Sequence, residues 1–385
     1  MTVSASISQE VRLAQKLIQA PSPSGHESPA VAVLLEAMRS LDFDEVYQDA
    51  AGNAIGIFRR GDGPTIMLNG HLDTVPTGEE SLWPYPSLSG AIEEGRLWGR
   101  GACDMKSAVA CMAYAARDAV DAGIAGTLVV AGVVQEEVGG LGARHLGETL
   151  PVDVVVLGEP SKLKLMLGHR GRVEIEVDIP GKIAHAAKNS LGDNALYRAA
   201  ALLRQLETLE LPQGGPLLGS SLTPTQLQSF PLGGANVVPG RASMTIDYRN
   251  IPGDDPETII ERLQALAPEA RFSIGQEHAQ SENGQVKLSF PRVAVPYLAP
   301  GENPLVNRAR EVIATALQSH QRPFEEDCWW FATDAPYLAK RGAIVLGFGP
   351  GEEELAHTSR ESVPLEHLSV ARDVYSALVR DYLKP

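Results

Sequence analysis

Hydrophobic residues in the first and last parts of the chain form two patterns, helical repeats and short continuous runs. Apolar positions recur at helical spacing from Val11 to Ile18 and from Ala30 to Leu41, and prolines and a glycine at 21–25 separate these two predicted helices. Further predicted elements are the runs Thr65–Leu68, Leu128–Val134, Val152–Leu157 and Ala343–Phe348 and the helices Met105–Ala119 and Leu365–Tyr382. Short buried strands that alternate with helices are typical of a mostly parallel sheet flanked by helices. The expected fold class is α/β.

The middle of the chain has a different pattern. It alternates polar and apolar residues in Val173–Ile179 and Ala242–Tyr248, and it has helical spacing in Leu196–Leu209 and Pro256–Leu266. Alternation of period two predicts strands with one wet face, as in an antiparallel sheet that carries helices on its other face. We therefore expect an inserted α+β domain at residues 171–292, within an α/β domain formed by residues 1–170 and 293–385.

Composition narrows the possible partners. The 385 residues suffice for two domains, and 33 basic against 48 acidic residues give a formal net charge of −15, which repels nucleic-acid phosphates. Three cysteines without C-x-x-C spacing predict neither disulfides nor a cysteine zinc site and indicate a reducing compartment. No segment reaches the roughly 18 apolar residues that span a bilayer, and no signal-peptide pattern opens the chain. We expect a cytoplasmic protein with neither nucleic-acid nor membrane partners.

Polar residues that can bind metals follow the predicted strands. His71 and Asp73 come after the first run and share a face, so the carboxylate can orient the imidazole. Asp104 follows a glycine-rich turn, where a helix cap and a metal ligand are both possible interpretations. The remaining candidates after strands are the acid pair Glu136 and Glu137, then Glu159, and finally His357.

Each candidate alone has a structural explanation, such as a solvated acid or a chance histidine. Their shared position is more informative, because sites in open α/β sheets lie beyond the carboxyl ends of the strands. Two histidines and three carboxylates supply only nitrogen and oxygen donors, which suit zinc or cobalt and suffice for two ions that share one carboxylate. One glutamate is then left to act as a base.

These spaced motifs resemble the M20 metallopeptidases, a family that includes acetylornithine deacetylase, succinyl-diaminopimelate desuccinylase, aminoacylase-1 and carboxypeptidase G2. The resemblance extends from the Ser22–Gly25 turn to Ala356–Thr358. It implies a zinc-exopeptidase-like catalytic domain with two Zn²⁺ or Co²⁺ ions in each subunit. Asp104 would bridge the two ions, one of which His71 and Glu159 would also bind, and the other Glu137 and His357. Glu136 would be the general base, and Asp73 would orient His71.

The resemblance also implies that the inserted domain forms a homodimer. His185 would reach the partner's active site to stabilise the oxyanion, while Asn236 and Arg249 would bind substrate, the arginine through its planar fork. Two positions depart from the family pattern. Asn189 replaces a proline of many members, and Pro336 stands where deacetylase-like members usually have an arginine that grips the substrate carboxylate.

The expected function is metal-dependent hydrolysis of the amide bond of a small N-acyl amino acid. A dipeptidase or carboxypeptidase of the same family is the alternative, with a dipeptide as substrate. A non-catalytic binding protein would usually have lost a ligand or the base, and all are present here. A nucleotide-dependent enzyme is disfavoured because the glycine-rich segments match neither G-x-G-x-x-G nor the P-loop pattern.

Overall fold

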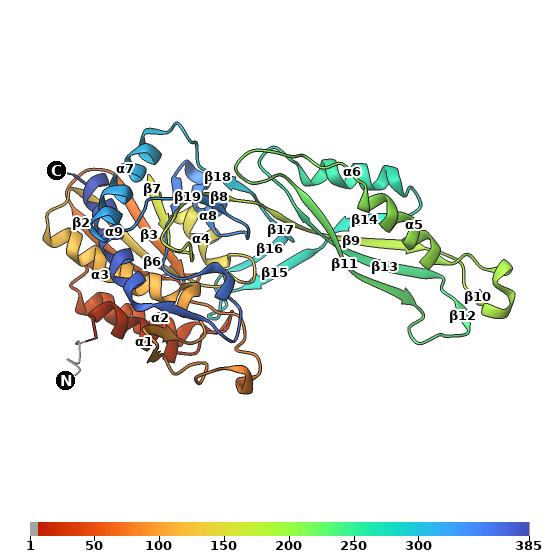
Figure 1. The fold of residues 1–385 in the computed structure, drawn as a ribbon, viewed down its shortest axis with the longest axis horizontal. Coiled ribbons are helices and arrows are strands. Elements are labelled where there is room, and N and C mark those ends of the chain that lie inside the picture. Colours follow the sequence, from red (N-terminus) through yellow and green to blue (C-terminus); the bar gives the residue numbers. More distant parts are fainter. Residues whose placement is uncertain (1–6, 385) are drawn as a thin grey trace.

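The computed structural model describes residues 7–384, and its largest layer is a nine-stranded sheet (Figure 1). The strand order is β1-β2-β6-β3-β7-β20-β8-β18, with β19 paired to β8. The strands are β1 (Glu45–Gln48), β2 (Ala54–Arg60), β3 (Thr65–His71), β6 (Gly126–Val133), β7 (Val154–Leu157), β8 (Leu165–His169), β18 (Tyr297–Leu298), β19 (Glu326–Trp329) and β20 (Ile344–Gly347). At its centre, β6, β3, β7 and β20 run parallel, so their carboxyl ends meet at one edge.

Helices cover both faces of this sheet, which confirms the predicted α/β class. Alternate residues of a strand point to opposite faces, so Ile66 and Leu68 lie in one hydrophobic core and Met67 in the other. The first core includes α1 (Gln9–Gln19), α2 (Ser28–Ser40), α3 (Ser107–Asp121), α7 (Pro304–Ser319) and α9 (Leu365–Tyr382). The second core includes α4 (Leu141–Thr149) and α8 (Ala335–Leu338).

A five-stranded antiparallel sheet forms the second layer of the molecule. Its order is β11-β13-β9-β14, with β17 paired to β9. The elements are β9 (Arg172–Pro180), β11 (Ser221–Phe230), β13 (Arg241–Arg249), β14 (Arg271–Ile274) and β17 (Val293–Ala294), with helices α5 (Ala195–Glu207) and α6 (Pro256–Leu266). Val173, Ile175 and Val177 of β9 are buried in a separate core with both helices, as the period-two alternation predicts.

Two short strand pairs extend this second sheet. At the end farthest from the nine-stranded sheet, β10 (Ala184–His185) pairs with β12 (Val237–Val238) (Figure 1). In the other direction, the hairpin of β15 (Gln276–Gln280) and β16 (Lys287–Pro291) packs on the first layer, where Phe290 joins the large core. The hairpin therefore lies in the segment 171–292 but is packed against the other layer.

Shorter elements complete the described part of the chain. They are β4 (Ala91–Glu93), β5 (Arg96–Trp98) and β21 (Ser362–Pro364), the 3₁₀ turns η1 (Glu80–Leu82), η3 (Ala186–Leu191), η4 (Ala339–Arg341) and η5 (Glu353–Leu355), and the π-type turn η2 (Ala102–Lys106). Helix α3 starts at Ser107 and not at Met105, because Asp104 and Met105 have non-helical backbone angles. Within residues 7–384, every helix is too short or too polar to cross a bilayer.

Candidate metal centre

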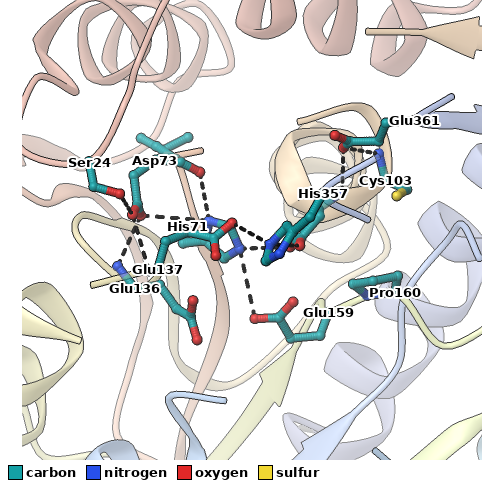
Figure 2. A network of polar contacts seen from close by, with 12 residues as sticks. Ser24, His71, Asp73, Cys103, Glu136, Glu137, Glu159, Pro160, His357 and Glu361 are labelled. Atoms are coloured by element: carbon teal, nitrogen blue, oxygen red, sulfur yellow. Dashed lines mark hydrogen bonds and ion pairs between the residues drawn. The ribbon is translucent and has the colours of Figure 1, made fainter. Parts of the chain in front are cut away.

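Side chains from several segments meet beyond the carboxyl ends of the parallel strands, where Figure 2 labels four of the five candidate ligands, His71, Glu137, Glu159 and His357. His71 is the last residue of β3, Glu137 lies in the loop after β6, and Glu159 follows β7 by two residues. Asp104 lies in η2, ahead of α3, and His357 comes from the loop beyond β20. The structure therefore brings together all five residues that the sequence singles out as ligands.

Asp104 lies between the two histidines. Its Oδ1 is 2.9 Å from Nε2 of His71, and its Oδ2 is 3.2 Å from Nε2 of His357. Glu137 Oε1 is 3.0 Å from the same nitrogen of His357, and Glu159 Oε1 is 3.9 Å from Nε2 of His71. The two oxygens of this carboxylate each lie beside the nitrogen of a different histidine, which is the arrangement of a ligand that bridges two metal ions.

Glu136 also lies near this cluster. Its carboxylate and ligand atoms of His71 and Glu159 all lie within 4.8 Å of one another, as do ligand atoms of His71, Asp104 and Glu137. Distance alone would admit Glu136 as a ligand. The same position also suits a base, which must reach a water held at the cluster.

The histidine ring of His71 is fixed from its other side. Its Nδ1 is 2.8 Å from the backbone carbonyl oxygen of Asp73 and 3.6 Å from the Asp73 carboxylate. A carbonyl only accepts, so Nδ1 donates and the neutral ring keeps its Nε2 lone pair free for a metal. The Asp73 carboxylate instead accepts hydrogen bonds from the backbone N–H groups of Glu136 (3.0 Å) and Glu137 (3.2 Å) and from the Ser24 hydroxyl (2.8 Å).

The electrostatics of the cluster fit a bound cation. Burial, followed by repulsion from neighbouring carboxylates, raises the pKa of Glu136 and of Glu159 well above the usual range. Burial also acts to raise the pKa of Asp104, but hydrogen bonds to His357 and His71 lower it overall. Hydrogen bonds to carboxylates, that of Asp104 first, raise the pKa of His357 to about 10. These shifts show that the cluster carries an excess of negative charge, which protons or divalent cations can neutralise. Its nitrogen and oxygen donors suit zinc or cobalt.

Sequence reasoning missed a buried ion pair behind the cluster. Arg100 Nη1 lies 2.5 Å from Oε2 of Glu361, and both side chains are almost completely buried. The other oxygen of Glu361 accepts the N–H groups of Cys103 and Asp104, both at 3.2 Å (Figure 2). Glu361 thus holds the turn that presents Asp104. The sequence offers only a weak signal for this role, an acid four residues after His357.

A cavity of about 510 Å³ opens beside the cluster. Its lining includes the candidate base and ligands Glu136, Glu137 and His357, together with Arg172, Arg249 and Arg292. Arg249, which the sequence singles out, donates from Nε to Asp247 Oδ1 at 2.6 Å. The other two arginines were not anticipated. Pro336, where the sequence predicts the loss of an arginine, lies in α8 and carries no guanidinium.

His185 and Asn236 lie together near β10 and β12, far from the cluster of candidate ligands in their own chain (Figure 1). His185 is exposed, and its Nδ1 accepts the N–H of Ala187 at 3.1 Å. The carbonyl of Asn236 accepts the N–H of Ala186 at 2.9 Å. Asn189 lies in the following turn, η3. Neither His185 nor Asn236 lines the cavity described above.

A helix-flanked sheet whose strand ends gather histidines and carboxylates defines the class of metal-dependent hydrolases with a zinc-exopeptidase-like catalytic layer. Residues 67–381 match the model of peptidase family M20/M25/M40. The chain belongs to this family, and it is an enzyme that acts on amide or peptide bonds.

Curated relatives cover most of the chain. YgeY of Escherichia coli (strain K12) is 27% identical and covers 97% of this chain and 94% of its own length. Acetylornithine deacetylase of Myxococcus xanthus is 30% identical over 79% of this chain and 76% of its own. Succinyl-diaminopimelate desuccinylase of Halorhodospira halophila is 26% identical over 98% and 100% of the two chains.

Solved structures share the fold. Aminopeptidase PepT from Bacillus cereus superposes with a TM-score of 0.76 over 98% of both chains, at 20% identity. YXEP of Bacillus subtilis, described as a dinuclear metal-binding peptidase of the M20 family, has a TM-score of 0.72 at 17% identity, covering 97% of this chain and 98% of its own. At these identities the likeness establishes the fold.

Proposed function

We propose that this protein hydrolyses the amide bond of a small N-acyl amino acid, with two zinc or cobalt ions and Glu136 as general base. The observation that carries the proposal is the position of Asp104, which offers one oxygen to His71 and the other to His357. The acetylornithine deacetylase and desuccinylase relatives support the substrate class.

The predicted ligands divide into two sets that share Asp104. His71 and Glu159 would hold one ion with it, and Glu137 and His357 the other. When bound there, the ions would polarise the amide carbonyl and make the attacking water more acidic.

The protein's own residues then move one proton. Glu136 accepts a proton from the water as the water oxygen adds to the amide carbon, and it passes that proton to the nitrogen as the C–N bond breaks. The products are a carboxylate and an amine that carries the second proton of the water. The two N–H bonds to Asp73 hold the backbone of Glu136 and Glu137 while this happens.

Arg249 is the residue that we assign to the substrate carboxylate. It lines the cavity with Glu136, and its planar fork suits a carboxylate better than an ammonium would. Because Pro336 supplies no guanidinium, we expect a substrate preference that differs from that of the acetylornithine deacetylases.

The test combines metal removal with a variant of the base. Chelator-treated protein should lose hydrolysis of acetylated amino acids and regain it with zinc or cobalt. Glu136→Gln should bind zinc normally but lose about 10²- to 10⁴-fold in kcat, the usual contribution of a general base. Glu27→Gln is the matched control, since Glu27 is a buried acid outside this cavity. Full activity without metal, or near-normal turnover by Glu136→Gln, would refute the proposal. Faster hydrolysis of dipeptides would favour the peptidase alternative.

We infer a homodimer formed through the second layer. Large apolar side chains are exposed around its far end, with Ile183 59%, Leu191 61%, Tyr197 77% and Leu232 70% accessible. Patches of this kind mark interfaces, and a partner would bring its own His185 and Asn236 toward the cluster.

Subunit mixing tests this arrangement. Glu136→Gln and His185→Ala should each be inactive alone, whereas equal mixtures after exchange should regain about a quarter of wild-type activity, because each hybrid keeps one complete site. A monomer in light scattering, or no recovery on mixing, would contradict the shared site.

A further inference from the structure

Asp334 is a buried carboxylate that the mechanism above does not use. It is 1% exposed, and its Oδ2 has no hydrogen-bond partner among residues 7–384. It immediately precedes α8, yet its side chain makes no capping bond to that helix. Buried polar groups are nearly always paired, and an unpaired carboxylate is costly, so this residue calls for a donor from outside the chain.

Arg144 lines the same cavity as Asp334, but its hydrogen bonds go to other residues. Arg144 donates to the carbonyl of Gly139 and to the hydroxyl of Tyr337, both at 2.8 Å. Its guanidinium is stacked between the rings of Phe290 and Tyr337, at 4.0 and 3.9 Å from their centres. Neither of these two hydrogen bonds from Arg144 goes to Asp334, whose Oδ2 stays unpaired within residues 7–384.

Close packing fixes where the carboxylate lies. A Cβ added at Gly140 would come within 2.6 Å of Asp334 Oδ1, so only glycine leaves room for the acid at this point. Asp334 lines the same cavity as Glu136 and Thr333, and it is not a member of either group of potential metal ligands. Asp334 therefore lies at the wall of the reaction space and outside both groups of candidate ligands.

The reaction supplies a suitable donor in that space. Glu136 delivers its proton to the nitrogen of the broken amide bond, so that nitrogen must lie beside Glu136. The amide nitrogen carries one N–H, the departing amine carries two, and the final ammonium carries three. A second carboxylate beside Glu136 can accept from one of these as positive charge develops on the nitrogen.

We propose that Asp334 binds the leaving nitrogen of the substrate through a hydrogen bond that strengthens as the amine departs. This inference rests on the proposed amide hydrolysis and adds a catalytic residue to it. It also defines the substrate class further, because the scissile bond must carry an N–H, as in secondary amides of primary amines.

The test compares an amide with its matching ester, in which oxygen replaces the N–H. Asp334→Asn in the zinc-loaded protein should lower kcat/KM for the N-acyl amino acid by about 10- to 100-fold, the range for a hydrogen bond to a charged group. The ester of the same acyl group with a 2-hydroxy acid should change by less than about threefold, since it offers no donor. Glu27→Gln should leave the amide-to-ester ratio unchanged. An equal loss on both substrates, or no loss, would overturn the role of Asp334.

A measurement on the wild-type protein covers the case in which the variant does not fold. The amino acid product should inhibit at least about tenfold more strongly than the 2-hydroxy acid of the same side chain. Equal inhibition would overturn the inference. If the wild-type protein with zinc hydrolysed no amide at all, the proposed function itself would fail. Active wild-type protein with an unchanged amide-to-ester ratio in the variant would refute only the assignment of Asp334.

Discussion

The buried pair of Arg100 and Glu361 allows a sharp prediction, because Glu361→Gln removes a charge without removing volume. The carboxylate accepts from Arg100 at 2.5 Å and from two backbone N–H groups at 3.2 Å. An amide keeps one accepting oxygen and presents an NH₂ group on the other side. If the amide oxygen faces the backbone, the NH₂ group of the glutamine and the guanidinium of Arg100 are two donors facing each other, and an arginine that is only 3% exposed loses its anion.

Removing one partner of a buried ion pair costs about 3–5 kcal/mol, which is a large part of a domain's usual stability of roughly 5–15 kcal/mol. The free energy of unfolding of the metal-free protein, measured in urea by circular dichroism, should fall by about that amount. Glu352→Gln is the matched control. Glu352 also binds an arginine, Arg96, but both side chains are partly exposed, so about 0–1 kcal/mol should be lost.

The same variant should weaken zinc binding by about 10- to 100-fold, because Glu361 holds the backbone of the turn that presents Asp104. Isothermal titration with zinc measures this effect. A stability loss of Glu361→Gln no larger than that of Glu352→Gln would refute the reasoning that the buried pair fixes the turn.

Three further predictions concern other parts of the structure. Burial raises the pKa of Glu27 from 4.5 to about 7, so between these pH values the folded state keeps a proton that the unfolded state has lost. Ionisation of Glu27 should therefore leave the free energy of unfolding unchanged below pH 4.5 and lower it by about 3 kcal/mol above pH 7. In urea titrations at a series of pH values, Glu27→Gln should not show this decline in the free energy of unfolding. Gly349→Ala should lower the free energy of unfolding by about 1–3 kcal/mol and weaken zinc binding, because the added Cβ would lie 2.2 Å from the carbonyl oxygen of Glu159. Gly301→Ala is the control, since its Cβ would lie in open space, and it should change neither stability nor zinc binding. Arg249→Lys should raise KM about tenfold with little change in kcat, because lysine lacks the planar fork; an unchanged KM would remove Arg249 from substrate binding.

Periodicity predicts the regular elements well. The helices Pro256–Leu266 and Leu365–Tyr382 agree with α6 and α9 at both ends, because their apolar stripes coincide with the helical register. The prediction fails at the start of α3, where Asp104 has φ −123° and ψ 89°. A periodic pattern records which side chains become buried, and it carries no information about an irregular turn that aims one carboxylate at a site.

Contacts between distant segments explain most of what the sequence could not predict. Ser28 is the first residue of α2, and its hydroxyl donates a hydrogen bond to Glu282 of the β15–β16 hairpin, 254 residues away. Arg100 and Glu361 are separated by 261 residues. The candidate ligands were easier to find, because four of the five follow predicted strands and the topology of parallel strands brings such positions together.

One residue, Asp73, positions both the proposed metal ligands and the proposed base. It accepts the N–H groups that place Glu136 and Glu137, and its own backbone carbonyl sets the tautomer of His71. It also accepts the Ser24 hydroxyl, which ties the turn after α1 to the same point. A displacement of this residue would therefore move a ligand of each proposed ion and the proposed base together. Three segments of the chain therefore meet at a single buried acid. Their contacts with it hold the donor atoms of loops that follow different strands at fixed positions, as catalysis by positioned groups requires.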